Sequence, residues 1–240
     1  MEPVNLQTIG LMGGMSSAAT AEYYEIINQK VKEAKGGHNI AEIIICSVNF
    51  AQIEYYIRTN AWDDAAIYLI DKAKRLEAAG VSCIFLGTNT MHRVREEIKA
   101  AIKIPFVDIF ETVAAEIKQH GKTKVGLLGT YPVMSDEFFI RAYNDCGIEV
   151  ITPQEKDKKE IDRIIFEELT HHQTKARAKE FYISCIRELT EKGAEGVILG
   201  CTEIKLLVNQ DDIPEVPLYD TLELHCAKAA RICTGEEQLM

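Results

Sequence analysis

Two stretches of this sequence have the same design, and they indicate the fold. The first is GVSCIFLGTNT, residues 80–90, and the second is GAEGVILGCTE, residues 193–203. In each, a glycine precedes an apolar run that ends in Leu-Gly, and a polar residue follows, Thr88 in one and Cys201 in the other. The polar residue comes eight positions after the glycine both times. The second stretch therefore looks like a repeat of the first.

A second pair of stretches supports an internal duplication. Residues 10–14, GLMGG, resemble residues 126–130, GLLGT. The offsets of 116 and 113 residues are nearly equal, so the two matches are almost in register. We therefore predict two similar halves, one formed by residues 1–113 plus 221–240 and the other by residues 114–220. We expect the last segment, 221–232, to form a helix that packs on the first half.

Short apolar segments alternate with amphipathic ones along the chain, which is typical of βαβ units with helices covering a parallel sheet. The expected class is α/β, with two flavodoxin-like half-domains related by a pseudo-twofold axis and the active site between them. Ligands of such sheets bind beyond the carboxyl ends of the strands. The expected strands are 7–12, 42–48, 82–86, 105–109, 124–128, 148–151, 196–199 and 216–219, and the expected helices are 61–79, 93–102, 136–145, 158–170 and 176–192.

Composition excludes several classes of function. The net charge of −10 argues against nucleic acid as a partner, because phosphate binding needs a basic face. We expect neither a membrane span nor a secretory signal, since no apolar run has the necessary length or flanks. The seven cysteines are odd in number and lack CxxC spacing, which favours reduced thiols in the cytoplasm over disulfides or structural zinc.

Cys201 is the strongest candidate for chemistry. It follows an apolar strand and precedes a stretch, 202–208, that we expect to be helical. Free amides and the dipole at a helix N-terminus favour a thiolate, and a thiol with a reference pKa of about 8.5 then becomes a usable base near neutral pH. The alternative is that this cysteine is a small apolar filler behind a buried strand.

Thr88 holds the equivalent position in the first half. Its hydroxyl is a poor proton acceptor, but it can donate a proton or relay one from water. The alternative is that Thr88, Asn89 and Thr90 only cap the helix that follows.

The stretch GGMSS, residues 13–17, follows the first strand and opens a helix, so its amides could hold a carboxylate. It lacks the spacing of a dinucleotide or P-loop motif, and a tight turn without a ligand is the alternative. The remaining polar candidates lack metal-ligand spacing, and we expect no metal site. They are His92, His225, Asp220 and Glu203, together with His171-His172 as a solvated helix end and a cluster of Lys156, Lys158 and Lys159 that is either solvated or functional.

At these positions the sequence resembles the aspartate/glutamate racemase superfamily. The resemblance covers essentially the whole chain and is carried, in order, by residues 10–16, 47–50, 88–92, 164–169, 200–204 and 220–225. It implies racemisation without pyridoxal phosphate or any other cofactor, in which two opposed groups remove and return the Cα proton. It also implies a homodimer. The substrate that it implies is a small amino acid, L-aspartate or L-glutamate.

One position departs from the usual pattern of that family. Most members carry cysteine where this chain has Thr88, and Cys83 does not replace it because it lies five residues earlier, within the strand. A subgroup with the same Thr/Cys pair acts on L-aspartate and L-glutamate or has broad specificity. We therefore expect Cys201 to take the proton from the L-isomer, Thr88 or a water beside it to return one, and the reverse direction to be slower.

The resemblance implies substrate-binding roles for further residues. It places Gln52 and Lys159, with Lys158 as the alternative, against the distal carboxylate of the substrate. The other substrate-binding residues, chiefly for the α-carboxylate, are Met15, Ser16, Asn89, Thr90, Thr130, Thr202 and Glu203.

Two other functions remain open from the sequence. A single catalytic thiol also fits a carbon-acid enzyme such as an arylmalonate-type decarboxylase, although the polar Gln52 and the lysine cluster do not suit an aryl substrate. The second alternative is a protein that binds amino acids without turning them over.

Overall fold

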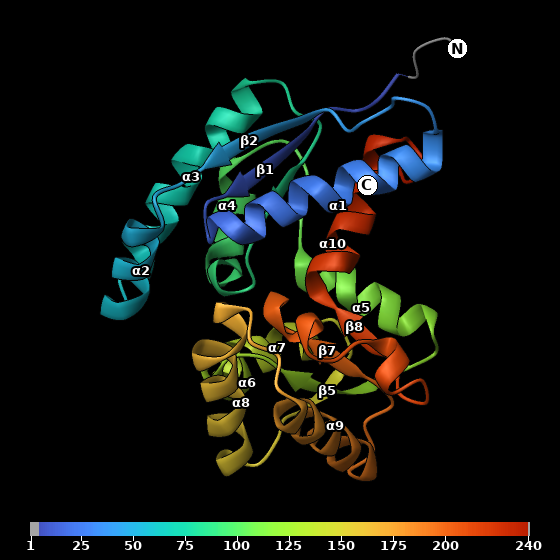
Figure 1. Ribbon diagram of the computed structural model, residues 1–240. Coiled ribbons are helices and arrows are strands. Elements are labelled where there is room, and N and C mark those ends of the chain that lie inside the picture. The colour runs from blue at the N-terminus through green and yellow to red at the C-terminus, as the bar shows by residue number, and fades with distance from the viewer. Residues whose placement is uncertain (1–4, 240) are drawn as a thin grey trace. The chain divides into compact units, whose positions relative to one another are not determined.

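The computed structural model describes residues 5–239, and the chain divides into two compact units. Unit 1 consists of Met1–Ile109 with His225–Met240, and unit 2 of Phe110–Leu224. Each unit is built on a four-stranded sheet in which every pair of neighbouring strands is parallel (Figure 1). The predicted α/β class is confirmed.

The two sheets have the same strand order, which confirms the internal repeat. In each, the first strand along the chain is central and pairs with the second and third, giving β2-β1-β3-β4 in unit 1 and β6-β5-β7-β8 in unit 2. Each of the eight predicted strands overlaps an observed one. The strands are β1 Ile9–Gly13, β2 Ile43–Ser47, β3 Ile84–Leu86, β4 Phe106–Val107, β5 Lys124–Leu128, β6 Glu149–Ile151, β7 Val197–Leu199 and β8 Leu218–Asp220.

The register between the first and third strands is the same in both sheets. Equivalent glycine amides donate hydrogen bonds at equivalent places, near the start and just past the end of the strand pair. These bonds are Gly10 N–H to Cys83 O at 2.9 Å, Gly126 N–H to Gly196 O at 2.8 Å, Gly87 N–H to Met12 O at 2.9 Å and Gly200 N–H to Leu128 O at 2.7 Å. Thr88 and Cys201 therefore stand at matching positions, one residue beyond the last bond.

The helices follow the strands as the amphipathic pattern predicts, α1 opens after residues 13–17 as expected, and α2, α5 and α6 are additional to the expected set. The α-helices are α1 Ser17–Lys35, α2 Phe50–Thr59, α3 Trp62–Ala78, α4 Arg95–Ala101, α5 Ile109–Gln119, α6 Tyr131–Ser135, α7 Glu137–Asp145, α8 Glu155–Glu167, α9 Ala176–Glu191 and α10 Thr221–Cys233. The 3₁₀ helices are η1 Thr90–Val94, η2 Leu169–His171, η3 Thr202–Leu206 and η4 Gln210–Asp212. The α-helix expected over 202–208 is wrong, because only the short η3 forms there.

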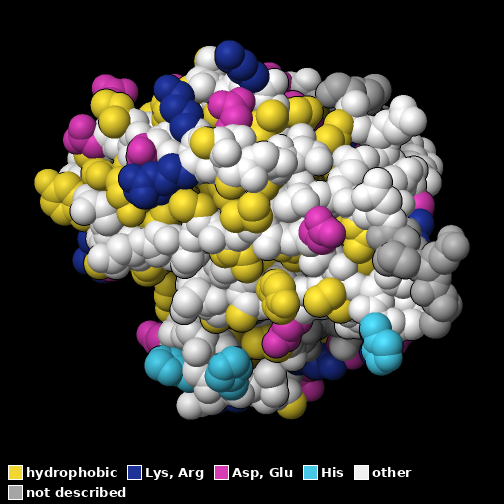
Figure 2. All heavy atoms as spheres, turned by 90° about the horizontal axis from the view of Figure 1, so that it is seen from above, with side chains coloured by type: hydrophobic (Ala, Val, Ile, Leu, Met, Phe, Trp, Pro, Cys, Tyr) yellow, Lys and Arg dark blue, Asp and Glu magenta, His cyan; other side chains and the backbone are white. Residues whose placement is uncertain are grey.

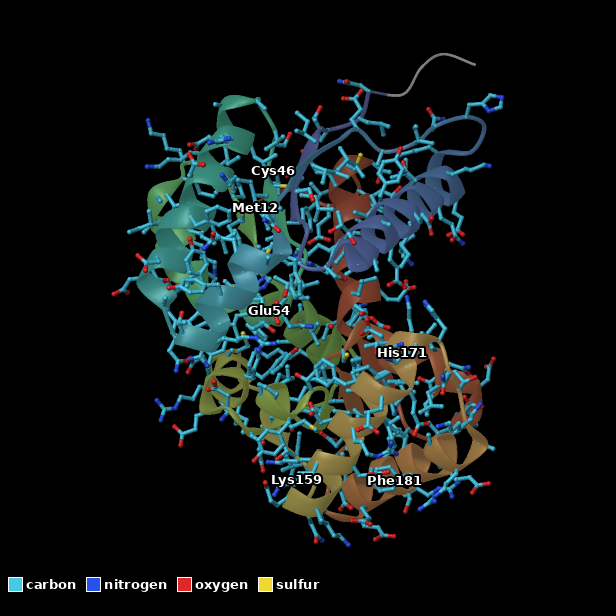
Figure 3. All side chains as sticks on the ribbon, turned by 60° about the vertical axis from the view of Figure 1, so that its left-hand side comes forward. Met12, Cys46, Glu54, Lys159, His171 and Phe181 are labelled. Carbon is cyan, nitrogen blue, oxygen red and sulfur yellow. The ribbon has the colours of Figure 1, made fainter. Side chains whose placement is uncertain are left out.

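Helices cover the sheets by burying one apolar stripe each. In unit 1, α1 and α3 flank β1 and β2, where Met12 and Cys46 are register partners on neighbouring strands (Figures 1 and 3). In unit 2, α9 packs against β5 at a glycine. A Cβ on Gly126 would lie 2.7 Å from the Leu189 side chain and 3.2 Å from that of Val197, so a larger residue would force these side chains to move. Burial of a leucine such as Leu189 contributes roughly 1.5–3 kcal/mol to stability.

The C-terminal helix α10 begins in unit 2 and belongs to unit 1 from His225 onward. Its end is held by the Gln7 N–H, which donates to Cys233 O at 2.9 Å. Within residues 5–239 no helix is both long and apolar enough to cross a bilayer. The face of the molecule in Figure 2 carries basic and acidic side chains interspersed with apolar ones.

Candidate functional site

The predicted site residues lie where the strands of each unit end. In a parallel sheet of this order, chain connections leave the two central strands in opposite directions, and ligands bind at that point. In unit 1, Met15 and Ser16 follow β1 while 88–90 follow β3; in unit 2, Thr130 follows β5 while 201–203 follow β7. The structure thus gathers the predicted residues into two sets, one at the carboxyl end of each sheet.

The Cys201 thiol is hydrogen-bonded to a carboxylate. Its Sγ–H donates to Oε2 of Glu203 at 3.0 Å, and the Thr202 hydroxyl donates to the same oxygen at 2.7 Å. All three side chains are partly buried. Oε2 of Glu203 therefore accepts two hydrogen bonds, one of them from the thiol. Glu203 is the nearest acceptor for the thiol proton.

The surroundings of Cys201 disfavour its thiolate, whereas the sequence predicts that they favour it. Burial, and then the negative charge of Glu203, raise the pKa of this thiol well above its usual value. The expected thiolate-stabilising helix is wrong, since η3 is a 3₁₀ segment of five residues whose first turn contains Glu203. Cys201 is therefore a thiol at neutral pH, with a base in contact with it.

Thr88 has a different environment. Its side chain is partly buried, and within the described chain its hydroxyl makes no hydrogen bond to another residue. Asn89 is the N-cap residue of η1 but makes no side-chain capping bond, so the capping interpretation is wrong for the Asn89 side chain. The position of the Thr88 hydroxyl is thus set by the Thr88 backbone alone, and no base is hydrogen-bonded to it.

A buried histidine fixes that backbone. His92 accepts the Ile109 N–H at Nε2, at 3.2 Å, so the ring proton lies on Nδ1, which donates to the Thr88 carbonyl at 2.6 Å. Burial lowers the pKa of His92 to about 4, so the ring is neutral at physiological pH. His92 acts as a positioning residue for Thr88.

His225 is a second buried, neutral imidazole in unit 1, and it has the opposite tautomer. Its Nε2–H donates to Val107 O at 3.0 Å, and its Nδ1 accepts the Tyr23 hydroxyl at 2.8 Å. Burial lowers the pKa of His225 to about 3. Both ring nitrogens are engaged with the protein, so His225 ties α10 to α1 and β4.

The loop after β1 is organised by Thr20, which sequence reasoning missed. The Thr20 hydroxyl accepts the Gly14 N–H at 2.7 Å and donates to Ser16 O at 2.8 Å. Gly14 has φ of +88°, and a Cβ there would lie 2.3 Å from Val48 O, so the position requires glycine. Because the Gly14 N–H donates to Thr20, it is not available to a ligand. Ser16 Oγ accepts the Ala19 N–H at 3.3 Å, which leaves the Ser16 hydroxyl proton for a ligand.

The loop after β5 is held by α8. Oδ1 of Asp162 accepts the Tyr131 N–H at 2.6 Å, directly after Thr130, and the charge of Asp162 also contributes to the raised pKa of Cys201. Thr130 is the N-cap residue of α6 and its hydroxyl makes no capping bond. No motif marks Asp162, because its role depends on how α8 packs against another loop.

The residues predicted for a distal carboxylate follow the outer strands. Gln52 is half-buried on α2, which comes after β2. Lys159, on α8 after β6, has a side chain 68% exposed and lies 3.6 Å from Glu155 (Figure 3). Lys158 is partly buried and has no ion pair among the described residues. Greater burial favours Lys158 over Lys159 as a ligand contact, while the charges of both lysines act on Glu155.

The remaining acidic candidate, Asp220, ends β8 next to β7. Burial raises its pKa to about 6, while its Oδ1 accepts the Glu223 N–H at 3.0 Å. Its register partner is Leu199, two residues before Cys201. Over residues 5–239, no three His, Cys, Asp or Glu side chains are grouped in a way that could hold a metal ion.

Comparison with known proteins agrees with this geometry. The sequence profile of the Asp/Glu/hydantoin racemase family matches residues 12–229. The broad specificity amino-acid racemase RacX of Bacillus subtilis (strain 168) is 26% identical over 219 residues, covering 89% of this chain and 92% of RacX. A Yersinia pestis protein proposed to be an Asp/Glu racemase has a crystal structure with 41% identity and a TM-score of 0.91, covering 95% of this chain and 99% of that one. An aspartate racemase homologue from Pyrococcus horikoshii OT3 gives 35% identity and a TM-score of 0.86, covering 95% and 100%.

Proposed function

The chain belongs to the Asp/Glu/hydantoin racemase family, and we propose that it racemises aspartate and glutamate without a cofactor, with the L-isomer as the better substrate. The observation that carries this proposal is the repeat. Two proton-bearing side chains, Thr88 and Cys201, follow equivalent strands of two equivalent sheets. Inversion of a carbon by proton transfer needs one such group for each face of the substrate.

In the proposed reaction, Cys201 removes the Cα proton of the L-isomer. Glu203 first accepts the Sγ–H proton along the 3.0 Å hydrogen bond, which leaves a thiolate as the base. The thiolate then takes the Cα proton and is again a thiol, while the electron pair of the C–H bond passes into the α-carboxylate as a planar enolate. Glu203 later returns its proton to solvent, so one proton leaves the site in each turnover.

The second proton reaches the opposite face of the carbon from the Thr88 side. A hydroxyl without a neighbouring base cannot readily take a proton, but it can pass one on from water. The proposed forward reaction asks Thr88 only to deliver, whereas the reverse reaction requires it to accept. The difference between the two strand ends therefore supports a preference for the L-isomer.

Binding of the α-carboxylate is proposed for the loops beside these groups. The amides of Met15 and Ser16 and the Ser16 hydroxyl proton are available in unit 1, as is the Thr130 hydroxyl in unit 2. Hydrogen bonds to this carboxylate strengthen as negative charge develops on it, and they lower the barrier to carbanion formation. The substrate-binding residues also proposed are Asn89, Thr90 and Thr202, with Gln52 and Lys158 for the distal carboxylate.

The direct test is proton NMR of L-aspartate and L-glutamate in deuterium oxide with the purified protein and no added cofactor. Loss of the Cα–H signal together with formation of the D-isomer is the expected result. Loss of the signal without D-isomer would mean that Cys201 works and Thr88 returns no proton to the other face. Absence of any exchange with either amino acid would overturn the proposal.

We also propose that the enzyme works in the cytoplasm as a homodimer. The support for the location is that all seven cysteines are free thiols, which suits a reducing compartment. Light scattering on the purified protein tests the assembly, and a monomer at micromolar concentration would contradict it.

A further inference from the structure

Asp108 is a buried carboxylate of unit 1 to which the proposed reaction gives no part. It follows the last residue of β4, and its side chain is 1% exposed. One of its oxygens, Oδ2, lies 3.0 Å from Arg95 Nε and 3.1 Å from Lys99 Nζ. Both cations belong to α4, so this carboxylate ties the end of β4 to that helix. A buried carboxylate with two charged partners is held in one position.

The residues on either side of Asp108 are held by buried histidines. Before it, the Val107 carbonyl accepts a hydrogen bond from His225 Nε2–H at 3.0 Å. After it, the Ile109 N–H donates to His92 Nε2 at 3.2 Å. The two imidazole rings are neighbours, with centroids 6.1 Å apart. Three consecutive residues at the end of β4 are therefore fixed by side chains from α10, α4 and η1.

These contacts matter because β4 itself gives little support to this segment. The strand has two residues, Phe106 and Val107, and it is the last strand of its sheet, with β3 as its neighbour. Its register with β3 ends at Val107, so Asp108 and Ile109 lie beyond the paired part of the sheet. The direction of the Ile109 N–H therefore depends on the side-chain contacts around it.

The Ile109 N–H decides which ring nitrogen of His92 carries the proton. While it donates to Nε2, the proton of the neutral ring stays on Nδ1, which donates to the Thr88 carbonyl at 2.6 Å. The bond to Nε2 is 3.2 Å long, so it is the weaker of the two and the first to be lost when the end of β4 shifts. Without it the ring can hold its proton on either nitrogen, and in one of these forms the Thr88 carbonyl has lost this donor.

We propose that Asp108 is a positioning residue for the return of the proton at Thr88. Its carboxylate, held by the two cations of α4, directs the Ile109 N–H at His92. His92 in turn fixes the backbone from which the Thr88 hydroxyl extends. The inference rests on the proposed function, because it assigns Asp108 to one of the two proton transfers. The other transfer, at Cys201 in unit 2, lies outside this chain of contacts and should not respond.

The planar intermediate can be protonated from either face, which gives a direct readout of the Thr88 side. In deuterium oxide, return from the Cys201 side gives the L-isomer with deuterium at Cα, and return from the Thr88 side gives the D-isomer. A displaced Thr88 slows only the second path. The ratio of D-isomer formed to Cα–H lost should therefore fall while the loss of Cα–H continues.

The test compares Asp108→Asn with Glu96→Gln in the full-length protein, by proton NMR of L-glutamate in deuterium oxide. Glu96 is the matched control, because it pairs with the same Arg95 and Lys99, at 3.1 and 3.6 Å, but is 69% exposed on α4. We expect Asp108→Asn to lower the ratio about tenfold and to change the loss of Cα–H by less than about threefold. Glu96→Gln should leave both as in the wild type.

A second variant keeps the test open if Asp108→Asn does not fold. Lys99→Gln removes one of the two cations and leaves the carboxylate in place. It should lower the ratio in the same direction, by about threefold. An unchanged ratio in Lys99→Gln together with an unfolded Asp108→Asn would mean that Asp108 serves stability alone, and it would overturn the inference.

A further measurement does not depend on turnover. Nitrogen-15 NMR of the histidine side chains at neutral pH reports which ring nitrogen carries the proton. We expect His92 to be protonated on Nδ1 in the wild type and in Glu96→Gln, and partly on Nε2 in Asp108→Asn. An unchanged His92 tautomer in Asp108→Asn, or an unchanged ratio of D-isomer to Cα–H loss, would overturn the inference and leave the proposed function intact. Absence of exchange in the wild type would instead overturn the proposed function, and the role of Asp108 with it.

Discussion

The end of β3 in unit 1 and the end of β7 in unit 2 share a backbone but differ in chemistry. Gly87 and Gly200 make the same hydrogen bond back to the first strand of their sheet, so the residues that follow are equivalent by position. In unit 2 that residue is a thiol in contact with a carboxylate. In unit 1 it is a hydroxyl whose backbone is held by a neutral histidine.

This difference shows how a duplicated fold can keep its geometry while its two halves take different parts in a reaction. The backbone bonds persist because they belong to the sheet, whereas the side chains beyond them are free to change. In unit 2 the neighbouring Glu203 is a base for the thiol. In unit 1 the neighbouring His92 fixes the backbone of Thr88. The asymmetry proposed for catalysis follows from that division, and each prediction below tests one side of it.

The largest effect is expected from removal of the thiol. Cys201→Ser replaces the sulfur by a hydroxyl with a much higher pKa, so both strand ends would then carry a hydroxyl. Exchange of the Cα proton of L-glutamate into deuterium oxide should fall about 10³-fold or more. Cys46→Ser, a partly buried cysteine on β2, is the matched control and should exchange at the wild-type rate. Retention of exchange in Cys201→Ser would remove the basis of the comparison.

The second prediction concerns the response of the two units to acid. The pKa values of His92 and His225 are about 4 and about 3 in the folded chain and 6.5 in the reference state, so the unfolded chain binds protons first. Their contribution to stability is complete above pH 6.5 and is lost as the pH falls toward 4. By pH 5 the loss is about 2 kcal/mol for each histidine.

Protonation of Asp220 in unit 2 has the opposite effect on stability from protonation of the two histidines. Its pKa is raised to about 6 from 3.8, so its buried charge destabilises unit 2 above pH 6 and is neutralised below it. Hydrogen exchange monitored by mass spectrometry, at pH 7.5 and at pH 5 with correction for intrinsic rates, separates the units. Peptides of β3, β4 and α10 should lose protection by more than those of β5 and β7. Equal loss in both units would contradict the assignment.

Much of the fold was predictable because it depends on local pattern and on repetition. Eight apolar runs were predicted as strands and each overlaps an observed strand, and the matching glycines around 80–88 and 193–201 predicted the internal repeat. The helix expected after Cys201 was wrong. Five residues of 3₁₀ helix fit between Cys201 and Leu207, and Leu207 is buried in the unit 2 core.

The site was predictable as a set of positions but not as an electrostatic environment. The sequence places Cys201 two residues from Glu203, and it does not say that the carboxylate turns back to the sulfur. Thr20 and Asp162 carry no motif, because each acts by accepting an amide hydrogen of a loop that becomes its neighbour only after folding. Burial, which sets the direction of the pKa shifts of Cys201, His92, His225 and Asp220, is a property of the packed chain.

The third prediction separates two roles for Glu203. In Glu203→Gln the negative charge beside the sulfur is removed, so the pKa of Cys201 should fall toward its ordinary value while remaining raised by burial. If Glu203 only opposed the thiolate, exchange at pH 7.5 would become faster. If it accepts the thiol proton, exchange should become about 10²-fold slower despite the lower pKa. Thiolate absorbance at about 240 nm, followed against pH, gives the pKa of Cys201. Glu215→Gln, which removes an exposed carboxylate of unit 2, is the control for net charge.

The smallest effect is expected from making the two strand ends alike. Thr88→Cys places a second thiol at the equivalent position, held by the same His92 contact to the backbone carbonyl. The new thiol has no carboxylate two residues later, since that position is Thr90, so it should act as a weaker base than Cys201. The initial rate of exchange from D-glutamate should rise about tenfold, while the rate from L-glutamate should change less than about threefold. Thr88→Val is the matched variant that removes the hydroxyl and keeps the shape, and it should slow formation of the D-isomer more than it slows loss of the Cα–H signal. If Thr88→Cys left the ratio of the two rates unchanged, the preference for the L-isomer would have to originate in substrate binding and not in the difference between a hydroxyl and a thiol.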